Sequence, residues 1–192
     1  MKKNVFSLVL AVVVGTTAFA TTPIEVEKKE VKTSESTVTW KGYKVTGSHY
    51  GTINIKEGAL LFEGDKLTGG EFVVDMATLV SIDLEGESKG KLEGHLKSDD
   101  FFGTSENPTS KLVFTTVKAT GKNSYQVTGD LTIKGKTNPV TFDVSVYGNK
   151  ATATMKVDRS KYDVKYGSGS FFDNLGDKTI YDEFDLVVDL AF

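Results

Sequence analysis

Residues 124–157, SYQVTGDLTIKGKTNPVTFDVSVYGNKATATMKV, decide the fold. Apolar and polar residues alternate along three runs in this stretch, most clearly in Val140-Thr141-Phe142-Asp143-Val144. A period of two is typical of a β-strand with one buried face and one solvent-facing face. Turn signals from Gly135 to Pro139 and at Gly148-Asn149 separate the runs. The stretch therefore predicts three consecutive antiparallel strands.

The same alternation extends outward on both sides of this stretch. It recurs in five runs, marked by Val38 and Trp40, Ile53 and Ile55, Phe72 to Met76, Leu112 and Phe114, and Phe184 to Phe192. Turn signals such as Glu57-Gly58 and Glu63-Gly64-Asp65 lie between the runs. The chain thus predicts an all-β fold of about eight antiparallel strands. Such strands form either a sandwich or a closed barrel, and the period alone does not choose between them.

One segment breaks the period of two. Residues 86–100, GESKGKLEGHLKSDD, are polar and tolerant of a helix, and Leu92 and Leu96 are spaced i, i+4. Two residues with this spacing lie on the same face of a helix. We therefore expect a short helix or an irregular cap over residues 86–100.

The first 20 residues have the pattern of a secretory signal peptide. Lys2 and Lys3 precede an apolar run from Val5 to Gly15, and Ala18-Phe19-Ala20 fits a cleavage site. The sequence therefore predicts export, with the periplasm as the location. Residues 21–35 are charged and largely without pattern, and we expect a flexible lead-in there. Residues 36–192 are expected to form one barrel domain.

The composition excludes several classes of function. The 192 residues contain no cysteine and carry a formal charge of −3. A chain without cysteine has no disulfide, no thiolate metal site and no cysteine nucleophile. A mildly acidic domain has no electrostatic footprint for nucleic acid. We find no Gly-x-Ser-x-Gly or His-Glu-x-x-His motif, and we predict no catalytic residue and no metal site.

Three segments, taken together, resemble a known family. They are VTWKG (38–42) followed by TGSHYG (46–51), LEGHLKSDDFF (92–102), and TGDLTIKG (128–135) followed by Pro139. In this order and spacing they resemble the YceI-like family of exported lipid-binding proteins. The resemblance covers residues 36–192.

The resemblance implies an eight-stranded antiparallel, lipocalin-like barrel with a long apolar pore and a short helical cap. Members of the family bind polyisoprenoid chains in that pore, including isoprenoid quinones and isoprenyl phosphates. The resemblance thus implies an isoprenoid lipid as ligand, no enzymatic activity and no other cofactor. It also implies a homodimer as a possible state, and a lipid carrier of this kind is expected to contact membranes transiently.

The alternation of faces supplies the candidate residues of the pore. By this criterion we expect ten residues to line the pore or the core, namely Trp40, Ile53, Phe72, Phe114, Val127, Leu131, Phe142, Val144, Met155 and Phe184. Each one either bounds a ligand cavity or belongs to a packed core. Trp40 has a further alternative, which is to plug the base of the barrel.

Five more residues are candidates for the pore mouth. His95 either hydrogen-bonds a quinone carbonyl or a phosphate near the pore mouth, or is an exposed loop histidine, or makes a hydrogen bond that holds the cap in place. Lys97 and Arg159 either meet a pyrophosphate or form ion pairs with nearby carboxylates. Lysine lacks the bidentate fork of arginine, which leaves head-group recognition open. Phe101 and Phe102 either line the entrance or anchor residues 86–100.

Two other functions compete with an exported isoprenoid carrier or sequestering protein. The final run, which ends in Phe192, resembles the closing strand of a small integral outer-membrane β-barrel. Against this alternative, the opposite faces of the strands are dense in Lys, Asp and Thr, and the chain has one Trp. The third alternative, a hydrolase, has no motif to support it.

Overall fold

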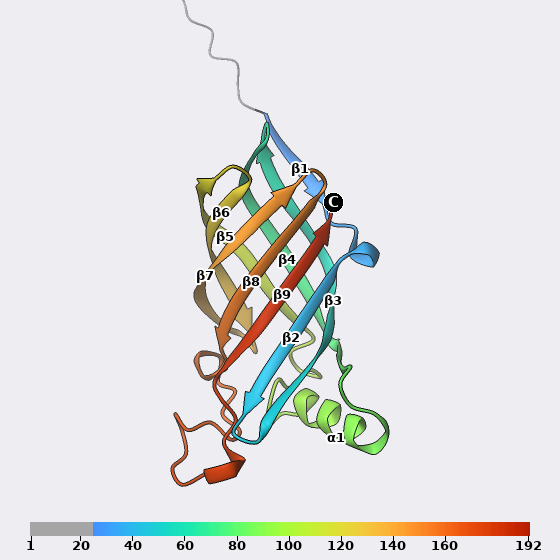
Figure 1. Ribbon diagram of the computed structural model, residues 1–192, viewed down its shortest axis with the longest axis vertical. Coiled ribbons are helices and arrows are strands. Elements are labelled where there is room, and N and C mark those ends of the chain that lie inside the picture. The colour runs from blue at the N-terminus through green and yellow to red at the C-terminus, as the bar shows by residue number, and fades with distance from the viewer. Residues whose placement is uncertain (1–24) are drawn as a thin grey trace, which may run out of the picture.

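The computed structural model describes residues 25–192, which form a long β-barrel (Figure 1). The predicted signal peptide at residues 1–20 and the first part of the predicted lead-in, residues 21–24, lie outside the described residues. The nine strands are β1 Val26–Glu30, β2 Thr37–Lys44, β3 Gly47–Glu63, β4 Lys66–Ser81, β5 Thr109–Gly121, β6 Ser124–Ile133, β7 Lys136–Tyr147, β8 Lys150–Asp158 and β9 Glu183–Ala191. The helices are α1 Gly86–Lys97 and the short 3-10 helices η1 Thr33–Glu35, η2 Arg159–Tyr162 and η3 Gly176–Lys178.

Strands β2 to β9 close into a barrel in which every neighbouring pair is antiparallel. The closing strand is β2, whose Val38 pairs with Ile53 of β3 on one side and with Val188 of β9 on the other. This confirms the predicted all-β, eight-stranded antiparallel, lipocalin-like barrel. Closure gives each of these strands a partner on both sides, which is why the barrel is favoured over an open sheet.

The prediction of a flexible lead-in over residues 21–35 is wrong for residues 26–30, which form strand β1, and for residues 33–35, which form helix η1. Strand β1 pairs antiparallel with the second half of β3, from Val26↔Glu63 to Glu30↔Ala59. Because β2 covers only the first half of β3, the long second half would otherwise have an open edge. Hydrogen bonding to that edge orders a segment that has no hydrophobic pattern of its own.

The turn predicted at Glu57-Gly58 is also wrong, because β3 continues through it. A register shift between Ile55 and Glu57 marks a β-bulge, which bends the strand without ending it. A side chain at Gly58 would come within 2.6 Å of the Phe72 ring, so glycine serves close packing here. The turn predicted over Gly135 to Pro139 is likewise too long, because β7 already begins at Lys136. Pro139 lies within β7 and pairs with Asp130 of β6.

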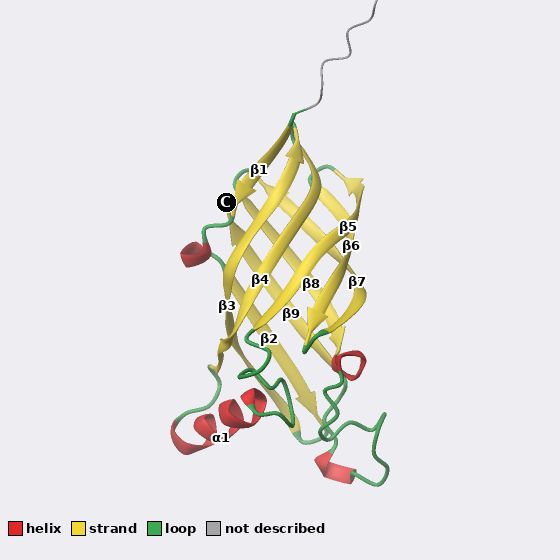
Figure 2. Cartoon of the chain, turned by 180° about the vertical axis from the view of Figure 1, so that it is seen from behind, coloured by secondary structure: helices red, strands yellow, loops and turns green. Residues whose placement is uncertain are grey.

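The two ends of the barrel differ. At the end near the C-terminus, side chains fill the interior, with the Phe62 and Phe192 rings 5.6 Å apart. There the Tyr125 hydroxyl accepts a hydrogen bond of 3.3 Å from the Leu67 N–H. The opposite end carries α1 and the loops that contain η2 and η3 (Figure 2). One end is therefore packed shut, and the other is built from irregular segments.

Helix α1 confirms the helix expected in residues 86–100. The Glu93 carboxylate accepts a hydrogen bond of 2.9 Å from the Ser81 N–H, which ties the helix to the end of β4. Leu96 is buried, and Leu92 packs beside it against the core. The helix thus lies at one side of the open end, next to β4, with Leu92 and Leu96 toward the core (Figure 1).

Candidate functional site

Two adjoining cavities occupy the barrel interior. The outer cavity, about 290 Å³, lies at the α1 end, and the inner cavity, about 90 Å³, extends toward the packed end. Both are bounded by Val38, Val74, Ser110, Leu131 and Leu186. We call the two cavities together the pore. Its walls run along the barrel axis, so it suits a long, slim ligand better than a compact one.

The pore walls are almost entirely apolar. Aliphatic residues, phenylalanines and Met155 make up most of the inner cavity. Its polar residues are Ser110, Lys111 and Thr152, of which only Ser110 is buried. Ser110 is buried, and its hydroxyl donates to the Met76 sulfur at 3.0 Å. Sulfur is a weak acceptor, so this contact only partly satisfies the hydroxyl. An interior of this kind favours a hydrocarbon ligand.

Most of the residues predicted to line the pore do bound it. The inner cavity contacts Phe72, Phe114, Phe142, Val144 and Met155; the outer cavity contacts Trp40, Ile53, His95, Phe101, Phe102, Arg159 and Phe184; Leu131 contacts both. For the residues of this group that lie in strands, the period of two predicts the inward position that the structure shows. Phe101 and Phe102 also pack against each other edge to face, with centroids 5.0 Å apart.

Val127 and Lys97 do not bound either cavity. Val127 is fully buried and belongs to the packed core, the alternative given for every residue of its group. Lys97 follows the inward-facing Leu96 on α1. Lys97 is half-buried and contacts neither cavity, although His95 and Leu96 beside it both bound the outer one. The expectation that Lys97 meets a head group has no geometric support.

Trp40 does not plug the base of the barrel. It bounds the outer cavity at the α1 end, and its indole N–H donates to the Val80 carbonyl at 3.2 Å. A side chain at Gly51 would come within 1.8 Å of the same carbonyl oxygen, so β3 and β4 meet here without room for a Cβ. This contact fixes one wall of the outer cavity.

Several wall residues were not among the ten chosen for the pore. From the strands these are Val38, Val74, Met76, Leu186 and Val188, which share the alternating faces of chosen residues, and Leu79, which does not keep the period of Phe72 and Met76. Ile180 and Tyr181 come from the irregular segment before β9, where no period exists to reveal them. Leu92 was identified only as a helical residue.

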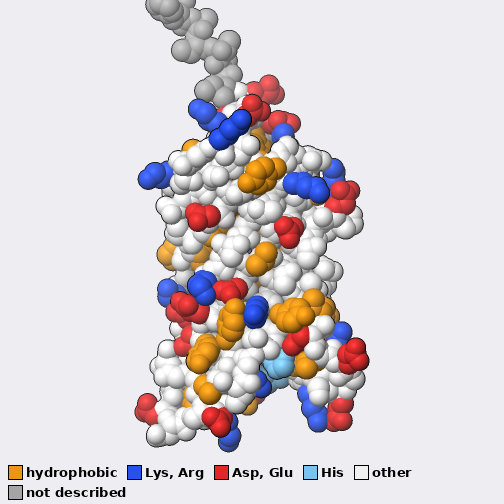
Figure 3. All heavy atoms as spheres, viewed as in Figure 1, with side chains coloured by type: hydrophobic (Ala, Val, Ile, Leu, Met, Phe, Trp, Pro, Cys, Tyr) orange, Lys and Arg blue, Asp and Glu red, His pale blue; other side chains and the backbone are white. Residues whose placement is uncertain are grey.

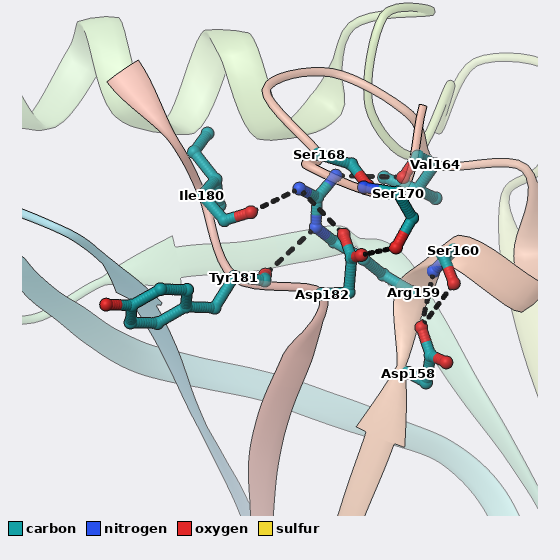
Figure 4. Close-up of polar contacts among 9 residues, drawn as sticks. All are labelled: Asp158, Arg159, Ser160, Val164, Ser168, Ser170, Ile180, Tyr181 and Asp182. Carbon is teal, nitrogen blue, oxygen red and sulfur yellow. Dashed lines mark hydrogen bonds and ion pairs between the residues drawn. The ribbon is translucent and has the colours of Figure 1, made fainter. Parts of the chain in front are cut away.

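Arg159 is buried in a network that uses its hydrogen-bonding groups (Figure 4). Its guanidinium donates to three carbonyl oxygens, those of Tyr181 at 3.2 Å, Val164 at 2.8 Å and Ile180 at 3.0 Å. It also lies 3.4 Å from an Asp182 carboxylate oxygen. The ion-pair alternative therefore describes Arg159, and a pyrophosphate would have to compete with these internal acceptors.

The Arg159 network joins three segments around the pore entrance. The second carboxylate oxygen of Asp182 accepts from the Ser170 hydroxyl at 2.6 Å. The Ser170 N–H donates to the buried Ser168 hydroxyl at 3.1 Å. Burial lowers the pKa of the Arg159 guanidinium, while the carboxylates of Asp182 and Asp158 oppose that shift. Together, these hydrogen bonds and the ion pair hold this wall of the outer cavity in place.

His95 presents an unpartnered polar atom at this end of the pore. Its Nε2 is buried and has no hydrogen-bond partner among the described residues. The ring contacts Tyr166 and Phe101 edge to face, with centroids 4.3 Å and 5.6 Å away. A buried polar atom without a partner is costly. A ligand oxygen in the outer cavity would offer His95 the missing hydrogen bond.

His49, the second histidine, also bounds the outer cavity, but it is paired. Its Nδ1 lies 2.8 Å from an Asp83 carboxylate oxygen. Burial acts to raise the pKa of Asp83, but hydrogen bonds from Ser81, His49 and the Tyr50 N–H outweigh it and lower that pKa below 3.8. His49 therefore has an internal partner, unlike His95.

Within residues 25–192, no three His, Asp or Glu side chains gather closely enough to hold a metal ion. In the same part of the chain, no helix has the length and apolar character needed to span a membrane.

One domain thus combines a closed eight-stranded barrel, an apolar pore and a helix at one end. A model of the YceI-like domain matches residues 30–192, almost the whole described chain. The chain belongs to the YceI-like family. The match begins at residue 30, near the end of β1, so the family domain starts earlier than the predicted residue 36.

Curated relatives of this YceI-like protein match over part of their length. A "UPF0312 protein" of Shewanella denitrificans is 35% identical over 98 residues, which cover 51% of this chain and 49% of the relative. A "UPF0312 protein" of Staphylococcus epidermidis is 46% identical over 74 residues, 38% of this chain and 39% of the relative. The matched part thus spans half or less of each relative.

Solved structures share the fold of this YceI-like protein. Burkholderia cenocepacia BcnA superposes with a TM-score of 0.63 at 23% identity, covering 84% of this chain and 99% of BcnA. A structure described as a polyisoprenoid binding domain from Saccharophagus degradans gives a TM-score of 0.57 at 11% identity, covering 86% and 97%. At these identities the likeness establishes the barrel architecture.

Proposed function

We propose that this YceI-like protein binds an isoprenoid chain in its pore and acts by holding or carrying that lipid rather than by catalysis. The observation that carries the proposal is the apolar pore, which is closed at one end and bounded by irregular segments at the other. Membership of the family and the likeness to a polyisoprenoid binding domain support the same ligand class. No other cofactor is part of the proposal.

Burial of a hydrocarbon tail would supply enough binding free energy without polar contacts. Each CH₂ group removed from water contributes about 0.8 kcal/mol, so a five-carbon isoprene unit contributes at most roughly 4 kcal/mol. Two units therefore contribute at most about 8 kcal/mol, which corresponds to micromolar affinity before the cost of association is subtracted. Affinity should therefore rise with the number of isoprene units until the pore is full.

The geometry of the entrance favours a neutral head group. Arg159 is already bound to protein acceptors, and Lys97 does not bound the pore. His95 offers one buried atom that can donate or accept a single hydrogen bond. A carbonyl or hydroxyl oxygen matches this single hydrogen bond. A pyrophosphate would bury several negative charges, for which Lys44 is the one lysine among the described residues that bound the outer cavity.

Export to the periplasm is part of the same proposal. It rests on the signal-peptide pattern of residues 1–20. A lipid carrier in an aqueous compartment between membranes would need an enclosed pore of this kind. Fractionation of cells that produce the full-length chain tests it, because a processed form should appear in the periplasmic fraction without detergent.

Trp40 provides a direct assay of the pore. It is the one tryptophan in the sequence, and its side chain bounds the outer cavity. Isoprenoid quinones of two, four and eight units, added to protein purified without detergent, should quench Trp40 fluorescence with increasing affinity. The control is a straight-chain alcohol of five carbons or fewer, which should not bind. Absence of any response, together with no co-purifying lipid in native mass spectrometry, would refute the proposed function.

A further inference from the structure

Aromatic side chains are exposed around the entrance of the pore. Tyr166 is 49% exposed, Phe171 43%, Phe172 51% and Tyr181 52%. We call these four residues the aromatic rim. All belong to the segment between η2 and β9, at the barrel end that carries α1 (Figure 1). Solvent exposure of four large rings in one short segment is unfavourable unless they meet a partner.

The rim is held in place by the polar network beneath it. The N–H groups of Phe171 and Phe172 both donate to the Ser168 carbonyl, at 3.2 Å and 3.0 Å. Ser168 is fully buried, and Ser170 is bound to Asp182. The two adjacent phenylalanines are therefore presented to solvent by an anchored loop, not by a frayed chain end.

The rim is continuous with the pore. Tyr181 itself bounds the outer cavity, and the Tyr166 ring lies 4.3 Å from the His95 ring that faces the same cavity. The Ile180 N–H donates to the Gly167 carbonyl at 2.8 Å, which joins the two parts of the rim. On the face seen in Figure 3, several hydrophobic side chains gather near this end of the barrel. A ligand that leaves the pore here passes the rim.

The charges around the rim are mixed. Lys165 pairs with Asp163 at 2.7 Å, and its ammonium also lies 5.4 Å from the centre of the Phe171 ring. Exposed Asp177 and Lys178 are adjacent in η3. No single-sign patch exists here to select an anionic surface. Phenylalanine and tyrosine favour the interface between lipid headgroups and acyl chains.

We propose that the aromatic rim docks on the surface of a lipid bilayer with net-neutral headgroups, with the pore entrance directed at the membrane. The rim rings enter the interface, and the anchored loop keeps them oriented. A hydrophobic ligand then moves between bilayer and pore without crossing water. Docking is a property of the protein surface, so it does not require the pore to be occupied.

Flotation with phosphatidylcholine vesicles that contain no isoprenoid tests this docking. The protein used should consist of residues 21–192, because the predicted signal peptide would itself bind lipid. This form keeps all the helices and strands that the structure describes. We expect the wild type to float with the vesicles, and the double variant Phe171→Ser/Phe172→Ser to lose at least about fivefold in partition coefficient. Raising the salt from 0.1 M to 0.5 M should leave binding nearly unchanged.

Tyr147→Ser is the matched control. Tyr147 is 61% exposed, but it lies at the packed end of the barrel, far from the rim. It belongs to the β7–β8 hairpin, in which the Asn149 carbonyl accepts a hydrogen bond from the Phe192 N–H. This variant should float like the wild type. Equal loss in both variants, or no flotation of the wild type, overturns the proposal. A dimer that dissociates in the rim variant, with vesicle binding unchanged, also overturns it and makes a second copy the partner.

A variant that binds vesicles more strongly than the wild type cannot be explained by misfolding, so a second pair of substitutions is included. Phe171→Trp/Phe172→Trp should float more strongly than the wild type, because tryptophan favours the bilayer interface. Titration of a soluble two-unit isoprenoid quinone against the Ser and Tyr147 variants reports on the pore separately. Retained quinone binding with lost flotation supports docking, whereas lost quinone binding in the wild type would refute the pore function and leave docking standing.

Discussion

The buried guanidinium of Arg159 lies 3.4 Å from the half-buried carboxylate of Asp182, and this pair ties the end of β8 to the segment that leads into β9. Asp182 also accepts the Ser170 hydroxyl at 2.6 Å. The wall of the pore entrance is therefore supported by a charge pair and not by packing alone. The Arg159 guanidinium lies 5.3 Å from the centre of the Phe101 ring, which extends the support to the segment after α1.

Replacement of this arginine should destabilise the fold. Arg159→Met leaves three carbonyl oxygens without their donor and Asp182 without its charge partner, and breaking a buried ion pair costs about 3–5 kcal/mol. We expect the free energy of unfolding, measured by urea titration, to fall by that amount. Lys161→Ala, at an exposed neighbouring position of η2, is the control and should change it by less than about 0.5 kcal/mol.

The same variant separates support from ligand recognition. If Arg159 bound a phosphate, Arg159→Met would weaken an isoprenyl phosphate more than an isoprenoid quinone of equal length. We expect the ratio of the two affinities, measured by Trp40 fluorescence, to stay unchanged. A selective loss of phosphate affinity of tenfold or more would contradict the assigned role.

The alternation of residues predicts the barrel wall well, because each inward position depends only on the local period of two. Phe142 and Met155 are examples, and the structure places both on the inner cavity. Residues at the entrance are harder to predict. The partners of Arg159 lie 5 to 23 residues away in loops, where distance along the chain does not determine contact. Strand β1 could not be predicted for a similar reason. Its residues have no alternating pattern, and hydrogen bonding to the distant second half of β3 orders them.

Tyr162 should make stability depend on pH in the alkaline range. Burial, and to a lesser extent Asp158, raises the pKa of Tyr162 from 10.0 to about 12. The folded state therefore holds the phenolic proton longer than the unfolded state, so the contribution is complete below pH 10 and is lost as pH rises toward 12. A shift of this size corresponds to about 2–3 kcal/mol.

Tyr162→Phe should remove that dependence. The hydroxyl is buried and has no hydrogen-bond partner among the described residues, so its loss should change stability at pH 8 by less than about 1 kcal/mol. Urea titrations at pH 8 and pH 11 measure both effects. The difference between the two proteins should be small at pH 8 and should favour the variant at pH 11. Parallel losses in both proteins would assign the alkaline sensitivity to other groups.

Ala153 offers a way to shorten the pore. It bounds the inner cavity from β8, where it pairs with Val144 and Val188. Ala153→Phe should fill much of the 90 Å³ inner cavity and leave the outer cavity intact. Affinity for an eight-unit quinone should fall at least tenfold, while that for a two-unit quinone should change less than threefold. Thr154→Phe, on the exposed neighbouring face, is the control.

Length discrimination is the sensitive readout for that variant. Overpacking costs roughly 1–3 kcal/mol in stability, so both variants should be compared at a temperature where they remain folded. If short and long quinones lose affinity equally, the tail does not extend into the inner cavity. If neither loses affinity, the ligand lies outside the pore.

His95 should discriminate between ligands that share a tail and differ in their oxygen atoms. Its Nε2 is buried without a partner at the outer cavity, so a ligand carbonyl or hydroxyl there gains one hydrogen bond. Such a bond contributes about 0.5–1.5 kcal/mol, or up to roughly tenfold in affinity. His95→Phe should abolish the preference for a prenyl alcohol or quinone over the matching hydrocarbon.

His95→Gln is the conservative control, because its amide retains a donor and an acceptor. It should keep part of the preference, whereas His49→Gln should leave the preference intact, since His49 is paired with Asp83. Trp40 fluorescence titrations with the oxygenated ligand and the hydrocarbon give the ratio of affinities directly. A ratio that stays the same in His95→Phe would mean that the head group lies beyond the entrance, in water or in the bilayer, and that the tail alone determines binding.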